Sequence, residues 1–363
     1  MNKQRLKEHP KLILITILTT LCYLFEVYYF GFSSSLLLWL TLLLITAPLY
    51  ILLQLLTFNS TRQSTFKLIF LIFISISFLI LVLSPTYPTE GIGSELNHQN
   101  LINILNSKKT YFFAANFYNN EEVLPEFFDQ FLKLCDYLGY DNVYLSIYES
   151  NSSDQTKPLL NKFRTLLNDK RIRNTIVTDE SHSKPIFVGN ERIRYLASVR
   201  NKTLEPLNDK QLDDEFNEFN HVVFFNDVYF DWFSVVRLIE TKNGNYDQVC
   251  AFDYFKIGLY DTWVTRDSCG RRVKPVWPHF QDHHSIKLLR EGKPIPVTSC
   301  WNGITSFDAR WFVDRNNNEN DIIRFRTLEE CVTSECLLSS YDLHLKSKTS
   351  PEIYMNPVVP TGE

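Results

Sequence analysis

Residues 219–230 read Phe-Asn-His-Val-Val-Phe-Phe-Asn-Asp-Val-Tyr-Phe. The centre of this stretch, 222–225, is a continuous hydrophobic run, as expected for a strand buried on both faces of a parallel sheet. The run ends abruptly in an amide and a carboxylate, Asn226 and Asp227. In open α/β sheets, ligands bind at the carboxyl ends of the strands. The stretch therefore predicts an α/β fold with a ligand site beside Asn226 and Asp227.

The sequence before this stretch alternates between strand and helix patterns. Buried-strand patterns occur at 111–115, 143–148 and 173–177. Helix patterns occur in a segment that ends near Gly139 and at 158–167 and 191–207. Because such alternation is typical of α/β proteins, it predicts a mostly parallel, doubly wound sheet. The chain contains neither GxGxxG nor a P-loop motif, which argues against a dehydrogenase or a P-loop enzyme.

Beyond Asp227 the pattern is less regular. Aromatic strands are expected at 248–255, 296–301 and 303–307, and a last helix at 334–345. The polar stretch 270–293 predicts a long loop, and loops of this length are often lids or binding loops. A proline-punctuated tail follows the last helix.

The first 84 residues differ in composition from the rest of the chain. Three almost wholly apolar stretches, 12–30, 36–58 and 68–83, are near the length of about 20 residues that spans a bilayer as a helix. Basic residues flank these stretches so that the positive-inside rule puts the N-terminus in the cytoplasm. A cleaved signal peptide is the alternative for the first stretch, but the two further stretches favour retention. We therefore expect a membrane anchor at 1–84, a stem at 85–109 and a lumenal domain at 110–363.

The composition of the expected lumenal part, residues 85–363, argues against nonspecific nucleic-acid binding and against a structural zinc site. Residues 85–363 carry 31 basic and 39 acidic residues, a net charge of −8, so nonspecific nucleic-acid binding is not expected. This part also holds six of the seven cysteines, an even number that permits disulfides in fifteen complete pairings. No CxxC or Cys/His spacing typical of a structural zinc site is present.

A helix pattern rich in arginine precedes the fold-determining strand. Arg194, Ala197 and Asn201 lie at positions i, i+3 and i+7 of one face, and Arg200 lies beside that face. Arginine makes bidentate contacts with phosphate and does not lose its charge. Two interpretations remain open: a helix that grips a pyrophosphate or ribose, and an ordinary surface helix.

The polar pair at the end of the fold-determining strand also has two interpretations. The side chains of Asn226 and Asp227 offer hard oxygen ligands, which can hold Mn²⁺ or Mg²⁺ against a diphosphate. The alternative is a turn that caps a helix starting near Asp231.

Eight short motifs follow one another along the chain. They are Arg194–Ala197, Arg200-Asn201, Phe225–Val228, Ala251–Asp253, Gly258–Val264, Arg266-Asp267, Ser299–Gly303 and Ser334–Cys336. Each motif is weak by itself, but their order and spacing are specific. Over about residues 110–357 the chain resembles the cryptococcal α-1,3-mannosyltransferase family, the capsule-associated fungal proteins of glycosyltransferase family 69.

This resemblance implies a GT-A-like glycosyltransferase anchored in the membrane of the Golgi or another secretory compartment. It also implies transfer of mannose from GDP-mannose with retention, assisted by Mn²⁺ or Mg²⁺. The residues that match the nucleotide-sugar site are Arg194, Arg200, Asn201, Asn226 and Asp227. Asn226-Asp227-Val228 stands where related enzymes have Asp-x-Asp, so one carboxylate is missing. Asp253 or His344 would then complete a metal site with Asp227.

The remaining motifs make chemical sense at a sugar site. Tyr260, Trp263 and Trp301 offer flat faces for a pyranose and Asn302 offers hydrogen bonds, so these four residues are expected to bind the acceptor. Catalytic residues, which hold the acceptor hydroxyl or stabilise developing positive charge, are expected to be Asp261, Asp267, Glu335 and Asp342. The alternative is an aromatic core with turn-forming polar residues and carboxylates on a helix surface.

The sequence thus predicts a membrane-anchored mannosyltransferase that forms an α-1,3 linkage on a mannose-containing glycan. The alternative, which the missing carboxylate favours, is a noncatalytic glycan-binding protein or partner subunit in a Golgi complex for polysaccharide synthesis or export.

Overall fold

The hydrophobic run 222–225 forms the strand β4 (His221–Phe225), and all five of its residues are buried. The structure is a computed structural model that describes residues 109–179, 189–208, 212, 219–255, 258–313 and 322–362. The three expected membrane spans and residues 85–108 of the expected stem lie outside the described residues. Among the described helices, none combines the length and the apolar character that a membrane crossing requires.

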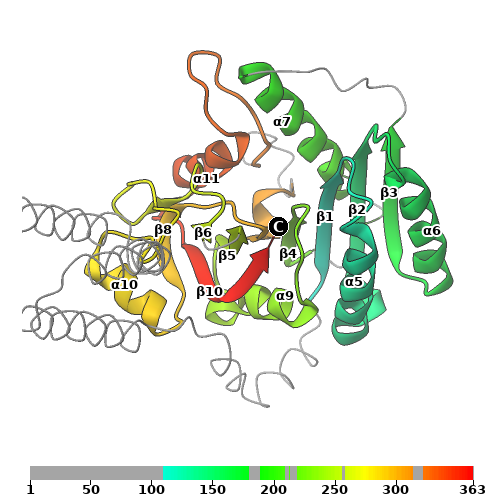
Figure 1. The fold of residues 1–363 in the computed structure, drawn as a ribbon, viewed down its shortest axis with the longest axis horizontal. Coiled ribbons are helices and arrows are strands. Elements are labelled where there is room, and N and C mark those ends of the chain that lie inside the picture. The colour runs from blue at the N-terminus through cyan, green and yellow to red at the C-terminus, as the bar shows by residue number, and fades with distance from the viewer. Residues whose placement is uncertain are drawn as a thin grey trace, which may run out of the picture. The chain divides into compact units, whose positions relative to one another are not determined.

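The first half of the sheet has the predicted parallel arrangement. Strands β1 (Tyr111–Phe117), β2 (Val143–Ser150) and β3 (Arg173–Asp179) join β4 in the order β3-β2-β1-β4, and all three pairings are parallel (Figure 1). The connecting helices are α5 (Leu124–Leu138), α6 (Thr156–Asp169) and α7 (Asn190–Leu204). The α-helix α7 stops before Pro206, whose missing N–H cannot continue the hydrogen-bond ladder, and a short 3₁₀ turn follows.

The second half of the sheet is mixed, so the prediction of a mostly parallel sheet is wrong there. Strand β4, helix α9 (Trp232–Ile239) and strand β5 (Gln248–Phe255) form the next βαβ unit, but β9 (Ile304–Asp308) lies between the two strands and runs antiparallel to both. The alternation of strand and helix patterns predicts the elements themselves, but it does not predict that the later strand β9 inserts between β4 and β5. The order then continues β5-β10-β8-β7, with β6 (Gly258–Leu259) paired to β5.

Two predicted irregular segments contain regular structure. The proline-punctuated tail forms β10 (Ile353–Gly362), which is parallel to β5 and antiparallel to β8 (Ile295–Ser299). Its register shifts between Met355 and Pro360, where proline cannot donate to the ladder. The expected loop 270–293 contains helix α10 (His283–Arg290), and the short strand β7 (Arg266–Asp267) precedes it.

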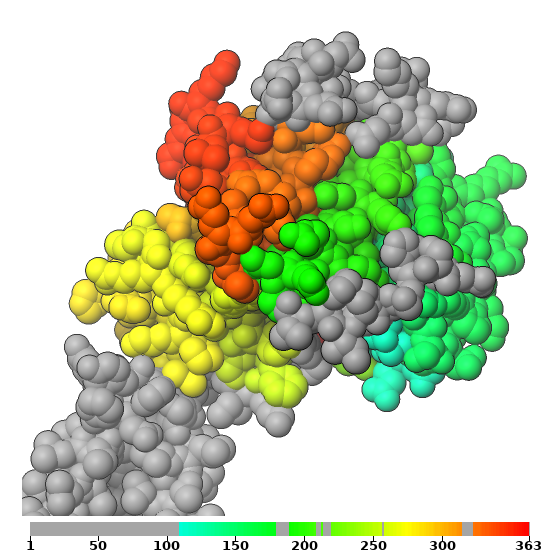
Figure 2. Space-filling model, turned by 90° about the horizontal axis from the view of Figure 1, so that it is seen from above, coloured from blue at the N-terminus to red at the C-terminus, as the bar shows by residue number. Residues whose placement is uncertain are grey.

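Helices cover both faces of the sheet. Helices α5, α6 and α9 share one hydrophobic core with alternate residues of β1 and β2, including Phe113 and Phe131, whose rings meet edge to face. Helix α7 packs on the opposite face, because Ser146 of β2 and Asn116 of β1 both hydrogen-bond to it. Helix α11 (Glu335–Lys346) lies beside α7, and Figure 2 shows the two from above in orange-red and green. Apart from Val276–His279, the described residues belong to one compact unit.

The turn between β8 and β9 depends on Gly303. Gly303 has φ of +59°, and a Cβ at this position would lie 2.0 Å from Thr361 Oγ1 of β10. The backbone nitrogen of Asn226 donates to the carbonyl oxygen of Gly303 over 2.9 Å. The glycine therefore permits β10 to pass directly behind the polar end of β4.

We predict that Gly303→Ala destabilises the protein far more than Gly270→Ala. Gly270 also has a positive φ, +77°, but a Cβ there would meet nothing within 4 Å. The control should therefore cost only the left-handed strain, about 1–2 kcal/mol, whereas Gly303→Ala adds a clash with β10. Thermal unfolding of both variants measures the difference. Equal melting temperatures would contradict the close approach of β10.

Candidate active site

A pocket of about 1110 Å³ lies at the carboxyl ends of β1, β2 and β4, at the edge of the sheet where the sequence predicts a ligand. Helix α7 forms one wall. The turn Tyr260–Trp263 and the first residues of α11 form another. Asn226 and Asp227 lie between these walls.

The wall formed by α7 follows strict helical spacing. Arg192, Tyr195, Leu196, Val199 and Arg200 line the pocket, and they occupy positions i, i+3, i+4, i+7 and i+8 of one helix face. This face differs from the predicted one, which contained Arg194 and Asn201, two of the expected nucleotide-binding residues.

Arg194 and Asn201 therefore lie outside the pocket, contrary to the prediction. Arg194 is exposed. The Asn201 amide donates to the Phe325 carbonyl over 2.8 Å and accepts from the Phe325 N–H over 2.9 Å, so it fastens residues 322–328 to α7. Only Arg200 and the strand-end pair Asn226 and Asp227 remain from the predicted nucleotide-binding set.

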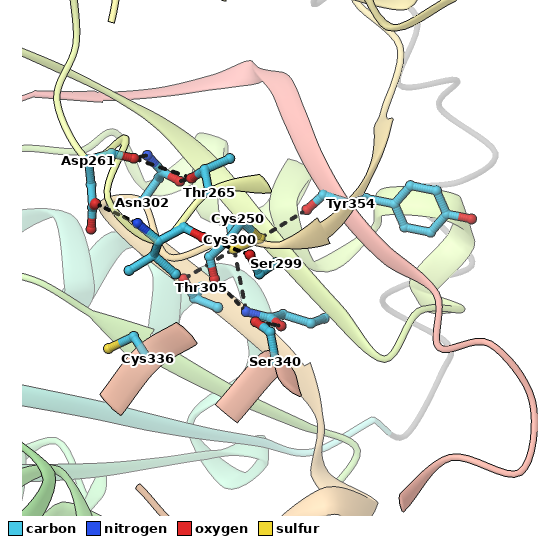
Figure 3. The surroundings of a disulfide bond; sticks show 12 residues. Cys250, Asp261, Thr265, Ser299, Cys300, Asn302, Thr305, Cys336, Ser340 and Tyr354 are labelled. Carbon is cyan, nitrogen blue, oxygen red and sulfur yellow. Dashed lines mark hydrogen bonds between the residues drawn. A yellow bond between two sulfur atoms is a disulfide. The ribbon is translucent and has the colours of Figure 1, made fainter. Parts of the chain in front are cut away.

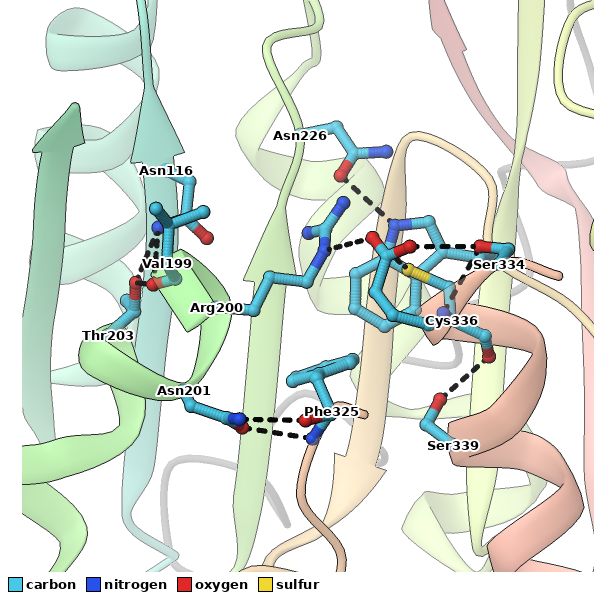
Figure 4. Close-up of polar contacts among 12 residues, drawn as sticks. Asn116, Val199, Arg200, Asn201, Thr203, Asn226, Phe325, Ser334, Cys336 and Ser339 are labelled. Carbon is cyan, nitrogen blue, oxygen red and sulfur yellow. Dashed lines mark hydrogen bonds and ion pairs between the residues drawn. The ribbon is translucent and has the colours of Figure 1, made fainter. Parts of the chain in front are cut away.

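Arg200 is the central cation of the pocket. Its Nε donates to Glu335 Oε1 over 3.0 Å, and its guanidinium lies 4.6 Å from the centre of the Trp301 ring. Burial alone would lower the pKa of Arg200, but Cys336, Glu335 and Asp227 outweigh it and raise the pKa above the ordinary value. The two terminal nitrogens have no partner among the described residues, and Figure 4 shows them turned toward Asn226.

Glu335 and Trp301 line the pocket and hold Arg200 in position. The carboxylate of Glu335 is only 2% exposed and accepts from Arg200 Nε, from Ser334 Oγ and from Cys336 Sγ. The ring of Trp301 is also 2% exposed, and its Nε1 donates to Asn226 Oδ1 over 3.2 Å. Because both side chains are almost completely buried and already have partners, the predicted catalytic role of Glu335 and the predicted acceptor-stacking role of Trp301 do not fit these positions.

The turn after β6 brings three predicted residues to the pocket. Tyr260 and Trp263 are 53% and 42% exposed, and both line its mouth together with Tyr229, which is 43% exposed. Asp261 Oδ1 accepts from the backbone nitrogens of Trp263 and Val264, over 3.0 and 3.4 Å. Burial raises the pKa of Asp261, although these backbone hydrogen bonds and Arg200 oppose the rise. Its Oδ2 has no partner among the described residues.

Asn302 holds this turn in place and does not reach the pocket, contrary to its expected role in acceptor binding. The side chain is fully buried, donates to the Asp261 carbonyl over 2.8 Å and accepts from Thr265 Oγ1 over 2.7 Å. A disulfide between Cys250 and Cys300 ties the same segment to β5 (Figure 3). Of the remaining described cysteines, Cys135, Cys269, Cys331 and Cys336 are free.

Three further predicted site residues have structural partners away from the pocket. Asp267 is buried and accepts from the backbone nitrogens of Cys269 and Arg271, so it shapes a turn. Asp342 makes a two-pronged ion pair with Arg326, at 2.9 and 2.7 Å. His344, in the last turn of α11, contacts the carbonyl of Thr298 at 2.9 Å. The predictions of catalytic roles for Asp267 and Asp342, and of a metal-binding role for His344, do not fit these positions.

The strand-end motif offers a metal ion one accessible carboxylate. Asp227 is exposed and accepts from Asn120 Nδ2 over 3.2 Å, whereas Val228 is buried in the core. Asp253 is buried and accepts from Thr361 Oγ1 over 3.2 Å. Among the described residues, no three His, Cys, Asp or Glu side chains form a group that can hold a metal. The residues present therefore fit Mn²⁺ or Mg²⁺ only if Asp227 shares the ion with phosphate oxygens of a substrate, as in many magnesium sites.

Several lining residues were not predicted from the sequence. Arg192 and Tyr195 would follow from the correct phase of α7. Asn116 and Asn120 follow the buried run of β1 in the way that Asn226 and Asp227 follow β4, so the same strand-end rule would have found them. Arg272, which donates to the Thr262 carbonyl over 2.8 Å, gives no sequence signal because it comes from an irregular segment.

We predict that Arg200→Ala strongly destabilises the protein, whereas Arg194→Ala does not. The first change leaves Glu335 buried without its cation, which typically costs about 3–5 kcal/mol. The control removes an exposed arginine from the same helix, for which about 0.5 kcal/mol or less is expected. Denaturant unfolding measures both. Similar losses in the two variants would contradict the supporting role of Glu335.

We predict that Asp253→Asn stabilises the protein at neutral pH. Burial raises the pKa of Asp253 from 3.8 to about 6; the Thr361 hydrogen bond opposes this, and Asp261 and Asp227 add to it. Between about pH 4 and pH 6 the folded chain therefore keeps a proton on Asp253 that the unfolded chain has released. The contribution of this group to the free energy of unfolding is complete below about pH 4 and is lost as pH rises through about 6. The variant should gain up to about 3 kcal/mol at pH 7 and show a flatter profile.

Unfolding free energies measured from pH 4 to pH 7.5 test this prediction. Asp342→Asn is the contrasting variant, because that carboxylate already has Arg326 as a partner and its loss should destabilise. An unchanged pH profile in Asp253→Asn would contradict the assignment.

Comparison with known proteins identifies the family. The family model described as cryptococcal mannosyltransferase 1 matches residues 110–342. Alpha-1,3-mannosyltransferase CMT1 of Cryptococcus neoformans is 28% identical over 254 residues, which are 64% of this chain and 53% of the relative. The chain thus spans about half the length of this curated relative.

Solved structures give weaker likenesses. The mannosyltransferase PcManGT from Pyrobaculum calidifontis, in complex with GDP-Man and Mn²⁺, is 12% identical, with 70% of this chain and 56% of that chain covered and a TM-score of 0.41. TarS 1–349 of S. aureus is 15% identical, with 70% and 60% covered and a TM-score of 0.40. These scores are too low to carry an argument. Because the family model matches more than half of the 363 residues, the chain belongs to the cryptococcal mannosyltransferase 1 family of glycosyltransferases.

Proposed function

We propose that the protein transfers mannose from GDP-mannose to a hydroxyl of a mannose-containing glycan and forms an α-1,3 linkage with retention. The observation that carries this proposal is the guanidinium of Arg200, which is fixed on Trp301 and Glu335 and leaves both terminal nitrogens open toward Asn226, the neighbour of Asp227 (Figure 4). A planar guanidinium with two open nitrogens suits bidentate binding of a phosphate. In a mannosyltransferase family, the corresponding ligand is the diphosphate of a mannosyl nucleotide.

The diphosphate would lie between Arg200 and Asp227. Asp227 would hold Mn²⁺ or Mg²⁺ together with the phosphate oxygens, and the ion would neutralise charge on the leaving diphosphate. Asn226 contributes a side chain whose orientation is fixed by Trp301 Nε1. Arg200 supplies permanent positive charge at the same position, so the leaving group is stabilised by groups that need not move.

The acceptor would enter at the mouth of the pocket. The exposed rings of Tyr229, Tyr260 and Trp263 offer apolar faces to a pyranose, and Tyr260 and Trp263 keep the acceptor-binding role predicted from the sequence. The open Oδ2 of Asp261 would accept a hydrogen bond from a sugar hydroxyl. Asn302 would act indirectly, because it fixes the turn that carries Asp261.

We further propose that the protein is anchored in the membrane of the Golgi or another secretory compartment, with the catalytic domain in the lumen. The three apolar stretches before residue 84 support an anchor. The Cys250–Cys300 disulfide suits an oxidising compartment.

We predict that Asp227→Asn in the full-length, detergent-solubilised protein lowers mannose transfer from GDP-mannose by at least about 100-fold, because the leaving diphosphate loses its metal contact. Asp231→Asn is the matched control. Asp231 caps α9 by accepting from the backbone nitrogens of Phe233 and Ser234, and asparagine caps a helix equally well. Transfer of labelled mannose to a mannobiose acceptor, with and without Mn²⁺, is the measurement.

Two results would contradict the proposal. Use of another sugar nucleotide in preference to GDP-mannose would overturn the donor. A wild-type protein that binds the glycan but transfers nothing would support the noncatalytic glycan-binding alternative, which the buried Val228 at the third position of the motif favours.

A further inference from the structure

Asn116 presents an unmatched hydrogen-bond acceptor at the wall of the pocket. It lies near the carboxyl end of β1 and lines the pocket. Its amide nitrogen donates to the Val199 carbonyl over 3.0 Å and to Thr203 Oγ1 over 2.6 Å, both on α7 (Figure 4). Its Oδ1 is buried and has no hydrogen-bond partner among the described residues.

The orientation of this amide follows from the hydrogens available around it. Thr203 Oγ1 donates its single hydrogen to the Val199 carbonyl over 3.0 Å. Consequently both oxygen atoms that face Asn116 on α7 can only accept. Turning the amide over would bring three acceptors together without a hydrogen between them. The nitrogen therefore points to α7, and Oδ1 is left for another donor.

A buried acceptor without a donor lowers stability, and a ligand N–H or O–H would recover that loss. The charged side chains Arg200, Asp227 and Glu335 mark the phosphate end of the pocket near β4 and α11. Asn116 lies beside Ser150 of β2 and on the side of Tyr195 of α7, two uncharged lining residues, whereas the charged Arg192 lines the pocket one turn before Tyr195. The part of a nucleoside diphosphate sugar that suits this end is the base.

The hydrogen-bonding pattern of the bases selects among them. Asn116 offers an acceptor and, because its nitrogen is already committed, no donor. Guanine presents two adjacent donors, N1–H and the 2-amino group, to which one oxygen with two lone pairs can bind. Uracil places its one N–H between two carbonyl oxygens, which would repel the amide oxygen.

We propose that Asn116 is the residue that recognises guanine in the donor, with Oδ1 accepting from the edge formed by N1–H and the 2-amino group. This inference rests on the proposed use of GDP-mannose and adds the residue responsible for its base specificity. Asn116 binds the base and does not touch the reacting sugar, so it determines affinity and selectivity for the nucleotide.

Inosine diphosphate tests the proposal because it equals GDP without the 2-amino group. The wild-type full-length protein should bind GDP about 5- to 10-fold more tightly than inosine diphosphate, as expected for one hydrogen bond. Asn116→Ala and Asn116→Ser, neither of which reaches the base, should bind the two nucleotides with nearly equal affinity. Asn174→Ala removes an amide of β3 that does not line the pocket, so it is the matched control and should keep the wild-type ratio. Displacement of a fluorescent GDP analogue measures all four proteins.

The outcomes separate this inference from the proposed function. Equal binding of GDP and inosine diphosphate by the wild type, or an unchanged ratio in the folded Asn116 variants, overturns the role of Asn116 while GDP remains the nucleotide. Binding of UDP in preference to GDP overturns the donor itself. If the variants bind 2′-deoxy-GDP and GDP equally while the wild type does not, Asn116 contacts the ribose, and the assignment to the base is wrong.

Discussion

The buried ion pair between Arg200 and Glu335 organises the site. It joins α7 to the first turn of α11, two elements separated by more than a hundred residues, and the guanidinium rests on the ring of Trp301. A buried pair of this kind contributes little net stability, since desolvation offsets much of the attraction. Under the proposed function, the pair provides a cation whose position is already fixed before a diphosphate binds. Groups fixed in advance in this way stabilise a leaving group without a reorganisation cost.

The support for this pair lies in a single short turn. Residues 300–303 carry Trp301 beneath Arg200, Asn302 beneath Asp261, and Gly303 against the end of β4. The Cys250–Cys300 disulfide begins the turn, and the Gln248 amide donates to the Cys300 carbonyl over 2.7 Å. Trp301 thus lines the pocket and acts by holding Arg200, whereas Asn302 and Gly303 do not line the pocket and support its walls. The accessible contacts come from neighbouring turns.

The sequence predicts the parallel half of the fold because each of its strands and helices has its own local pattern. Strand β4 and the polar pair after it were recognisable for the same reason. The phase of α7 was not, since Arg192, Arg194 and Arg200 allow more than one face, and only packing against β1 selects between them. The sequence cannot distinguish a catalytic aspartate from one that shapes a turn, as Asp267 does, or one that forms an ion pair, as Asp342 does. The position of β9 between β4 and β5 could not be predicted, because it depends on contacts between residues far apart in the sequence.

The placement of β10 has a consequence for biosynthesis. This strand, residues 353–362, lies between β5 and β8, and its Thr361 contacts both the buried Asp253 and the turn at Gly303. While the chain is being made, β1 to β4 can pair as they emerge from the ribosome, but β5 and β8 must wait for residues more than fifty positions beyond β8. During that interval the edge of β5 has no neighbour on one side, and an open strand edge is a template for aggregation. The half of the domain that holds Asp261 therefore completes its sheet last during translation.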